Sequence, residues 1–396
     1  MSSSEKVIEY SQKDLPPIFG RLGIVLFVIG IVLTVLAYMS DPVRSAFNNV
    51  ILLEFLTSVG LGALFFVALE HLVGAVWSTP FRRVFEILSA LLLILPLVAL
   101  PVYFHAHDIF HWTHTDIVAA DDILSQKSSY LNMTFFTIRI IIYFAIWIIF
   151  YWVLIRNSNK QDKSRDQKIS KLNARISAVF MPIFALTITF SAIDWLMSLE
   201  PHWFSTIFGV YYFSGTVVVS LAVGTILVIW LNEKGLLVKG IKQDHYYSLG
   251  ALLFAFINFW AYIAFSQYLL IWYANLPEET FWFLKRWEGS WMIFSILFIF
   301  VHFVVPYFGL LSQPSKTDPK RLKYMAGWLV FAHLMDLYWI VIPTFSPDGF
   351  VFGWIEIGFI ILAIGIIMVV FYFKAKKTNL VAIGDPKLQR GIDFRL

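Results

Sequence analysis

The sequence of 396 residues contains no cysteine. This absence excludes iron–sulfur clusters held by thiolates, covalently attached c-type haem, disulfide bonds and zinc sites with cysteine ligands. An electron carrier would have to be a haem b or a quinone, or belong to a partner chain. The histidines inside hydrophobic stretches, His71, His302 and His333, fall on three different stretches, so they offer no evident pair of axial haem ligands.

Charged residues are also scarce, at 14%, whereas 59% of the residues are hydrophobic. A chain of this composition would not stay soluble. Its apolar residues form long runs, and about 20 apolar residues of helix cross the hydrocarbon core of a bilayer. The sequence therefore predicts an all-α polytopic membrane protein. We place ten transmembrane helices at 20–39, 50–77, 84–104, 132–155, 174–198, 203–231, 247–273, 288–311, 325–344 and 350–373.

The 30 Lys and Arg residues alternate strongly between successive loops. Nearly all of them lie in one set of loops and at the two ends of the chain, and only Arg44, Lys127, Lys285 and Arg286 lie in the other set. The positive-inside rule then places both termini in the cytoplasm. Anionic lipid headgroups account for the basic residues, so no nucleic-acid partner is expected.

The predicted organisation is simple. A cytoplasmic N-terminal segment (1–19) and a cytoplasmic tail (374–396) flank the transmembrane domain (20–373), and a charged cytoplasmic linker (156–171) joins the fourth and fifth helices. The two ends are polar, and we expect them to be extended or bound to a partner. No cleavable signal peptide is evident at the N-terminus.

Asp194 is the strongest candidate for a functional residue. A charge at the centre of a bilayer costs at least ~2.5 kcal/mol, so a charged residue within a membrane span usually has a function. Thr187, Ser191 and Ser198 fall on the same helical face. This stripe could order water and pass protons, or it could simply pack against another helix. Arg139, at a similar depth, is the expected counter-ion of Asp194, either as a structural ion pair or to tune the carboxylate.

Glu70 and His71 are neighbours near the cytoplasmic end of the second stretch. A carboxyl beside an imidazole suits proton uptake, whereas Glu70 could instead extend toward the interface. Other acidic residues lie near helix ends, where solvation is the simpler expectation. These are Glu54, Glu86, Glu288 and Glu356.

The later helices supply a second polar group. His333 and Asp336 are three residues apart and share a face, and His302 lies at a comparable depth on another helix. On the seventh helix, a repeat at i, i+4 and i+8 and the adjacent Gln267 are expected to add hydrogen-bonding groups to a polar interior. The repeat consists of Asn258, Tyr262 and Ser266. The alternative is a hydrogen-bond cluster that only holds the helices together.

The longest external loop carries four histidines and two aspartates that could ligate a metal without thiolates. They are His105, His107, His111, His114, Asp108 and Asp116. Their spacing matches no site that we can name, so a surface that docks another subunit is the preferred interpretation. We therefore predict no metal site on this chain.

The segment from Asp194 to Thr206, DWLMSLEPHWFST, resembles the signature of the ActF membrane subunit of alternative complex III, a bacterial quinol:cytochrome c oxidoreductase. The loop HWTH at 111–114, followed by Tyr130, Leu131, Asn132 and Arg139, resembles another segment of that family. The family is similar to the NrfD and polysulfide-reductase membrane subunits. This resemblance extends over nearly the whole chain.

The resemblance implies two four-helix bundles, helices 2–5 and helices 6–9, flanked by helices 1 and 10, in the bacterial inner membrane. It implies that haem c and iron–sulfur clusters are carried by partner subunits. Those partners would be a homologous membrane subunit, an iron–sulfur protein and a multihaem cytochrome c. The resemblance also allows a terminal oxidase as a further partner.

The leading hypothesis is a subunit without a redox centre that supports quinol oxidation and conducts protons. The conducting candidates are Glu70, His71, Arg139, Asp194, His302, His333 and Asp336. No cofactor is expected on this chain, and a quinone is the candidate if one binds. The alternatives are a quinone-binding subunit in its own right, a stand-alone secondary transporter and a structural scaffold.

Overall fold

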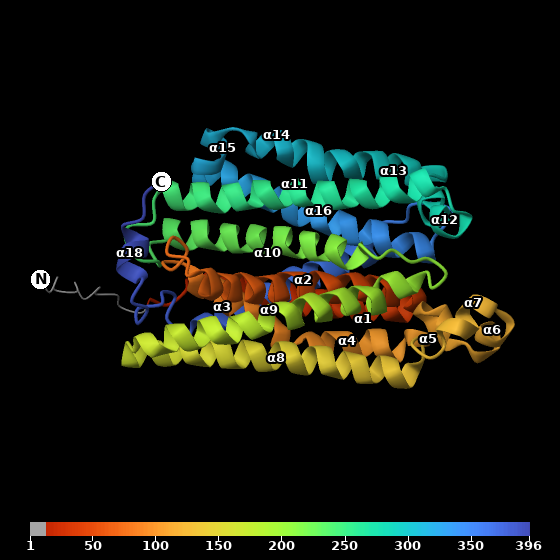
Figure 1. Cartoon of the computed structure of the whole chain (residues 1–396), viewed down its shortest axis with the longest axis horizontal. Coiled ribbons are helices and arrows are strands. Elements are labelled where there is room, and N and C mark those ends of the chain that lie inside the picture. The colour runs from red at the N-terminus through yellow and green to blue at the C-terminus, as the bar shows by residue number, and fades with distance from the viewer. Residues whose placement is uncertain (1–12) are drawn as a thin grey trace, which may run out of the picture.

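The computed structural model describes residues 13–396, and every regular element in that range is helical. Ten of the described helices are long and apolar enough to cross a membrane, which confirms the predicted all-α polytopic membrane protein. They lie side by side along the long axis of the molecule (Figure 1). These helices are α1 (Pro17–Ser40), α2 (Pro42–Val73), α3–η1–α4 (Arg82–Phe104), α8 (Met133–Ser164), α9–η3 (Gln167–Leu199), α10 (Phe208–Glu233), α11 (Gln243–Ala274), α13–η4–α14 (Gly289–Leu311), α16 (Pro319–Phe345) and α17 (Trp354–Ala375).

The helix ends follow local capping chemistry. α2 begins earlier than predicted because the Asp41 side chain accepts a hydrogen bond from the backbone N–H of Arg44 and caps the helix. It ends at Gly74, which adopts a left-handed conformation with φ 67°.

The charged linker predicted at 156–171 is itself largely helical. Polar residues with good helix propensity carry α8 to Ser164, and α9 already begins at Gln167. Only Arg165, with φ 51°, and Asp166 separate the two helices.

The centre of the fold is the pair of α2 and α10, whose side chains are nearly all buried. α10 packs against α2, α9, α11 and α16, and α2 also contacts α4, α9 and α17. The grouping into two four-helix bundles stays a prediction.

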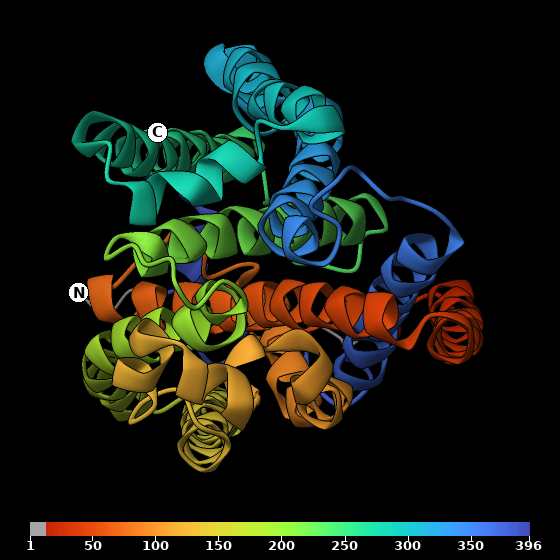
Figure 2. The ribbon, with the colours of Figure 1, turned by 90° about the vertical axis from the view of Figure 1, so that its right-hand side faces the viewer.

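α1 lies at the edge of the molecule against α17 (Figure 2). Two glycines allow the close approach of these helices. A Cβ at Gly30 would lie 2.5 Å from the Cα of Leu362, and a Cβ at Gly365 would lie 2.4 Å from the backbone nitrogen of Phe27. Small residues at such crossings are typical of helix pairs in membranes.

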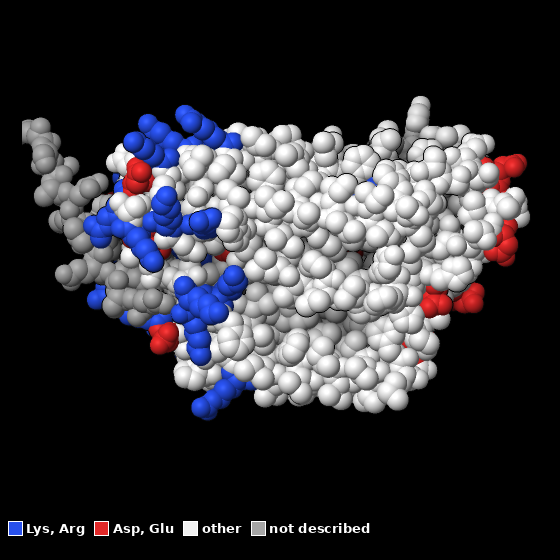
Figure 3. Space-filling model, turned by 90° about the horizontal axis from the view of Figure 1, so that it is seen from below, with Lys and Arg blue, Asp and Glu red and all other residues white. Residues whose placement is uncertain are grey.

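Charge is segregated along the long axis. Lys and Arg gather at the end that holds α15 (Gln313–Thr317) and α18 (Leu388–Ile392), here called the basic end, and Asp and Glu gather at the opposite, acidic end (Figure 3). An uncharged surface separates them, as expected for a protein surrounded by lipid tails. Which end faces the cytoplasm stays a prediction from the positive-inside rule.

Five of the short helices that connect the long ones lie at the acidic end. They are α5 (Ala106–Ile109), η2 (His111–Thr113), α6 (Thr115–Ala120), α7 (Asp122–Lys127) and α12 (Pro277–Lys285). The long external loop of the sequence is therefore largely helical.

The C-terminal tail folds back over the basic end, so it is not extended, which was one of the two predicted alternatives. Val381 is fully buried, and a Cβ at Gly384 would lie 1.9 Å from the carbonyl oxygen of Gln161. Apolar residues at 380–383 supply the surface for this packing. Most of the N-terminal segment predicted at 1–19 lies outside the described residues.

Candidate functional site

Asp194 lies near the acidic end of α9 and is fully buried. Arg139 of α8 donates to both carboxylate oxygens, from Nε at 2.8 Å and from Nη2 at 2.9 Å, and the Tyr143 hydroxyl donates at 2.7 Å. The guanidinium also stacks on the Tyr130 ring at 3.9 Å. The ion pair expected from the sequence is thus present, in the bidentate form that binds most strongly.

The hydroxyl stripe of α9 is buried but does not form a continuous chain. Ser191 donates to the carbonyl of Ile188 at 3.0 Å, and Ser198 donates to that of Asp194 at 2.6 Å. Thr187 accepts from the indole N–H of Trp147 at 3.0 Å. Each hydroxyl is therefore satisfied locally, and a proton moving along this face would need water between the groups.

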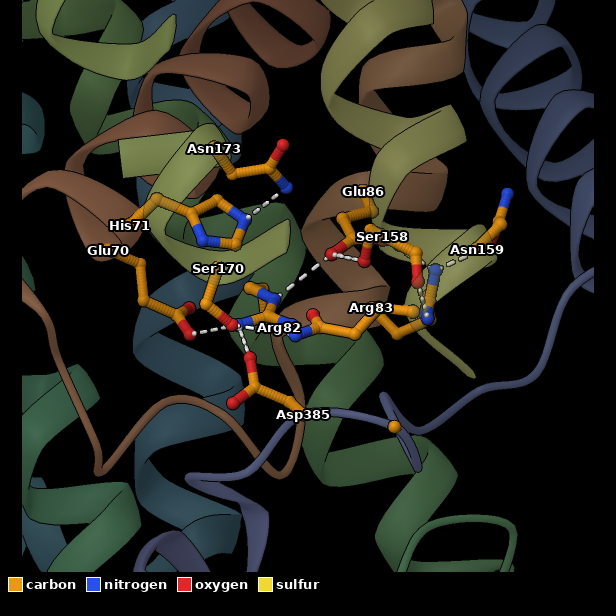
Figure 4. A network of polar contacts seen from close by, with 12 residues as sticks. Glu70, His71, Arg82, Arg83, Glu86, Ser158, Asn159, Ser170, Asn173 and Asp385 are labelled. Atoms are coloured by element: carbon orange, nitrogen blue, oxygen red, sulfur yellow. Dashed lines mark hydrogen bonds and ion pairs between the residues drawn. The ribbon is translucent and has the colours of Figure 1, made fainter. Parts of the chain in front are cut away.

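A second polar centre occupies the basic end and is built around Arg82, the first residue of α3 (Figure 4). Its guanidinium binds Glu70 of α2 at 3.2 Å, Glu86 at 3.0 Å and Asp385 of the tail at 2.7 Å. All four side chains are buried. Glu70 therefore points into the protein rather than toward the interface.

Arg83 extends this network to α8. It binds Glu86 at 2.8 Å and Asp162 at 2.7 Å, and the Ser158 hydroxyl donates to Glu86 at 2.8 Å. Burial raises the pKa of Asp385, but the Arg82 guanidinium outweighs burial and holds that pKa below its ordinary value.

His71 lies beside the network, with its Nε2 atom 3.4 Å from the Asn173 amide nitrogen (Figure 4). The sequence predicted roles for Glu70 and His71 but not for the two arginines or Asp385. The available signal was the pair Arg82-Arg83 followed by Glu86 three and four residues later, a spacing that places opposite charges on one helical face.

The third polar centre joins α10, α11, η4 and α16 around Asp336. The Tyr211 hydroxyl and the Trp260 indole N–H both donate to its carboxylate, the latter at 3.1 Å. His302 approaches the carboxylate to 3.8 Å and stacks on the Trp260 ring at 3.6 Å. The structure thus brings His302, His333 and Asp336 together as expected.

His302 sits in a π-helical turn, Phe300–Val304, of the kind that often marks functional sites. The four ring nitrogens of His302 and His333 are buried and have no hydrogen-bond partner among the described residues. One donor atom from each of His302, His333 and Asp336 lies within 4.8 Å of the others, which would also suit a shared metal ion.

The prediction that the Asn258, Tyr262 and Ser266 face of α11 lines a polar interior was wrong. Tyr262 is 66% exposed, Asn258 donates to the carbonyl of Phe254 in its own helix at 2.7 Å, and Ser266 is only half-buried. Gln267 is buried as predicted, and Trp260, which was not predicted, also faces inward. A phenol and an amide can occupy a membrane-facing surface, so their polarity alone did not identify the interior.

Four acidic residues near helix ends were expected to be solvated, and this expectation was wrong for three of them. Glu54, Glu86 and Glu356 are buried, and only Glu288 is exposed. Glu356 forms a bidentate pair with Arg44 at 2.7 and 2.8 Å. The partner of Glu356 comes from a distant helix, whereas Glu86 pairs with Arg82 and Arg83 of its own helix.

The histidines of the loop predicted to be external lie near the surface at the acidic end. His107 and His114 stack at 3.7 Å, and His105 contacts Asp108 at 2.8 Å. His202 binds Asp121 at 2.6 Å. The backbone N–H of Leu124 and the His202 imidazole hold the pKa of Asp121 below its ordinary value.

No family model matches this sequence, and a search of curated proteins found no match. Functional inference therefore rests on the three buried polar centres and on the sequence resemblance.

Proposed function

We propose that this chain is an integral membrane subunit of a bacterial respiratory quinol:cytochrome c oxidoreductase of the alternative complex III type, and that it conducts protons through its buried polar centres. The supporting observation is that acidic side chains are enclosed among packed helices toward both ends of the bundle. Asp194 lies toward the acidic end and Glu70 toward the basic end. Enclosed ionisable groups in membrane proteins usually mark ion pathways.

The two ends differ in a way that suits directional transfer. At the basic end, which the positive-inside rule assigns to the cytoplasm, Glu70 and His71 form the uptake region. Toward the other end, Asp194 is held by Arg139 and Tyr143, whose hydroxyl can both accept and donate a proton. His302, His333 and Asp336 supply a second set of titratable groups between α10 and α16.

In this proposal the redox centres belong to partner subunits. The chain has no cysteine, and haem c and iron–sulfur clusters would be carried by a multihaem cytochrome c and an iron–sulfur protein. A homologous membrane subunit would complete the membrane part in the bacterial inner membrane.

Purification of the tagged chain from its native membrane tests the assembly. We expect it to bring down multihaem and iron–sulfur proteins, with quinol:cytochrome c reductase activity. A chain that purifies alone would favour a secondary transporter instead.

Substitution of Asp194→Asn tests conduction. We expect the complex to assemble and transfer electrons, while vesicles containing it translocate fewer protons per electron. Glu356→Gln is the matched control, because it removes another buried, arginine-paired carboxylate outside the proposed path. Unchanged proton translocation in Asp194→Asn would remove this residue from the path.

A quinone site on this chain is the second candidate. A cavity of about 510 Å³ lies between α11 and α13, with Trp260, Gln267 and Tyr211 in its lining. Aromatic walls with a few polar groups suit a quinone headgroup. A photoreactive quinone analogue that labels only a partner subunit would contradict this second candidate.

A further inference from the structure

The seam between the central helices α2 and α10 contains an acidic residue that the proposed path has not used. Glu54 is fully buried, and neither oxygen of its carboxyl group has a hydrogen-bond partner among the described residues. We propose that Glu54 is an exchangeable proton-binding site, connected to a chain of hydroxyl groups that crosses from α2 to α10. This inference rests on the proposed conduction role and adds a site to it.

The position of Glu54 favours a neutral carboxylic acid over an ionised carboxylate. It is the thirteenth residue of α2, and at 1.5 Å per residue it lies roughly 18 Å along the helix from Pro42. No Lys, Arg or His lies within ion-pair distance among the described residues. An ionised carboxylate without a partner is far more costly to bury than a neutral carboxylic acid, so the neutral form suits this environment.

Tyr212 of α10 connects Glu54 to the hydroxyl chain. Its hydroxyl donates to the backbone carbonyl of Glu54 at 3.0 Å, which places the hydroxyl next to this residue. The Ser58 hydroxyl donates to that of Tyr212 at 3.1 Å, and the Thr216 hydroxyl donates to that of Ser58 at 3.3 Å. Every member can donate and accept, so the chain can reverse its direction when a proton passes.

A close helix contact makes this geometry feasible. A Cβ at Gly62 would lie 2.6 Å from the Cβ of Ser220 and 2.7 Å from the carbonyl oxygen of Thr216. Because Gly62 has no side chain, α10 can approach α2 closely enough for their hydroxyls to meet.

The same turn of α10 faces the Asp336 centre. Tyr211, the neighbour of Tyr212, donates to Asp336, and one turn along, a Cβ at Gly215 would lie 3.0 Å from the His333 ring. α10 thus presents one tyrosine to Glu54 and the next to Asp336. Glu54 therefore lies where protons could pass between the first helices and the later ones.

Infrared difference spectroscopy of the full chain in lipid nanodiscs tests the proposal directly. We expect wild-type protein to show the C=O stretching band of a protonated carboxyl group at neutral pH. The Glu54→Gln substitution should abolish this band, and transfer of the wild-type protein to D₂O should shift its frequency. Glu54→Asp should retain the band at a changed frequency. This second variant keeps the assignment of the band testable if Glu54→Gln does not fold. Glu288→Gln is the control, since Glu288 is exposed and should contribute no such band.

Exchange kinetics test the hydroxyl chain. Ser58→Ala and Thr216→Val should keep the Glu54 band but slow its exchange in D₂O at least tenfold. Thr225→Val, which changes a buried threonine of α10 outside the chain, should leave the exchange rate unchanged. The proposal is overturned if Glu54→Gln loses no band, if the band does not exchange, or if Ser58→Ala exchanges at the wild-type rate. These results do not depend on partner subunits, so they are independent of the purification test above.

Discussion

Arg82 and Asp385, which are 303 residues apart in the sequence, form a buried ion pair of 2.7 Å. The pair attaches the C-terminal tail to the part of the basic end that contains Glu70 and His71. The tail is therefore an integral part of the basic end, and it covers the place where proton uptake is proposed.

Asp385→Asn should loosen the tail. Removing one partner of a buried pair typically costs ~3–5 kcal/mol, and we expect about 2 kcal/mol here because Glu70 and Glu86 still neutralise Arg82. Thermal unfolding in detergent and the rate of proteolytic cleavage within the tail measure the effect. Asp393→Asn, at an exposed position of the same tail, should change neither quantity.

The tail should also respond to acid. Since the pKa of Asp385 is lowered in the folded protein, its contribution to stability is complete above its ordinary pKa of about 4 and is lost as pH falls through its lowered value. Proteolytic release of the tail should therefore increase only in strongly acidic solution. An increase between pH 6 and 8 would contradict this assignment and point to a histidine instead.

Arg139→Ala should destabilise the protein by about 3–5 kcal/mol, because it leaves the Asp194 carboxylate buried without its cation. The double variant Arg139→Ala with Asp194→Ala should be more stable than Arg139→Ala alone. Unfolding experiments on the four members of this double-mutant cycle measure the coupling. Additive effects would show that the bidentate pair contributes nothing to folding.

The sequence predicted the ten helices well, because long apolar runs have few structural alternatives in a membrane. It also predicted the pairing of Arg139 with Asp194, because two opposite charges at the same depth in a membrane are stabilised by forming an ion pair. Arg82 and Arg83 were assigned to the positive-inside pattern, and nothing in that pattern distinguishes an exposed arginine from a buried one.

The polar surface of α11 could not be predicted for a related reason. Helical spacing shows that Asn258 and Tyr262 share a face. Only tertiary packing shows that Tyr262 is exposed and Asn258 half-buried, while Trp260 reaches Asp336. The partners of Glu356 and Asp385 are likewise set by contacts between distant segments, which one sequence does not reveal.

Gly365→Val should weaken the packing of α1 on α17, because even its Cβ would clash with the backbone of Phe27. We expect a loss of about 1–3 kcal/mol, as for other overpacked contacts. Gly327→Val is the control, since a Cβ there meets nothing within 4 Å. Thermal unfolding of both variants measures the difference, and equal melting curves would contradict the close α1–α17 contact.

The absence of cysteine makes the orientation directly testable, because any introduced cysteine is unique in the chain. Asp116→Cys lies on α6 at the acidic end, and Lys239→Cys lies between α10 and α11 at the basic end; both positions are exposed. If the basic end is cytoplasmic, a membrane-impermeant maleimide applied to spheroplasts should label Asp116→Cys, and Lys239→Cys should react only after the membrane is opened. The opposite pattern would invert the topology and place the Glu70 and His71 region on the side to which protons are released.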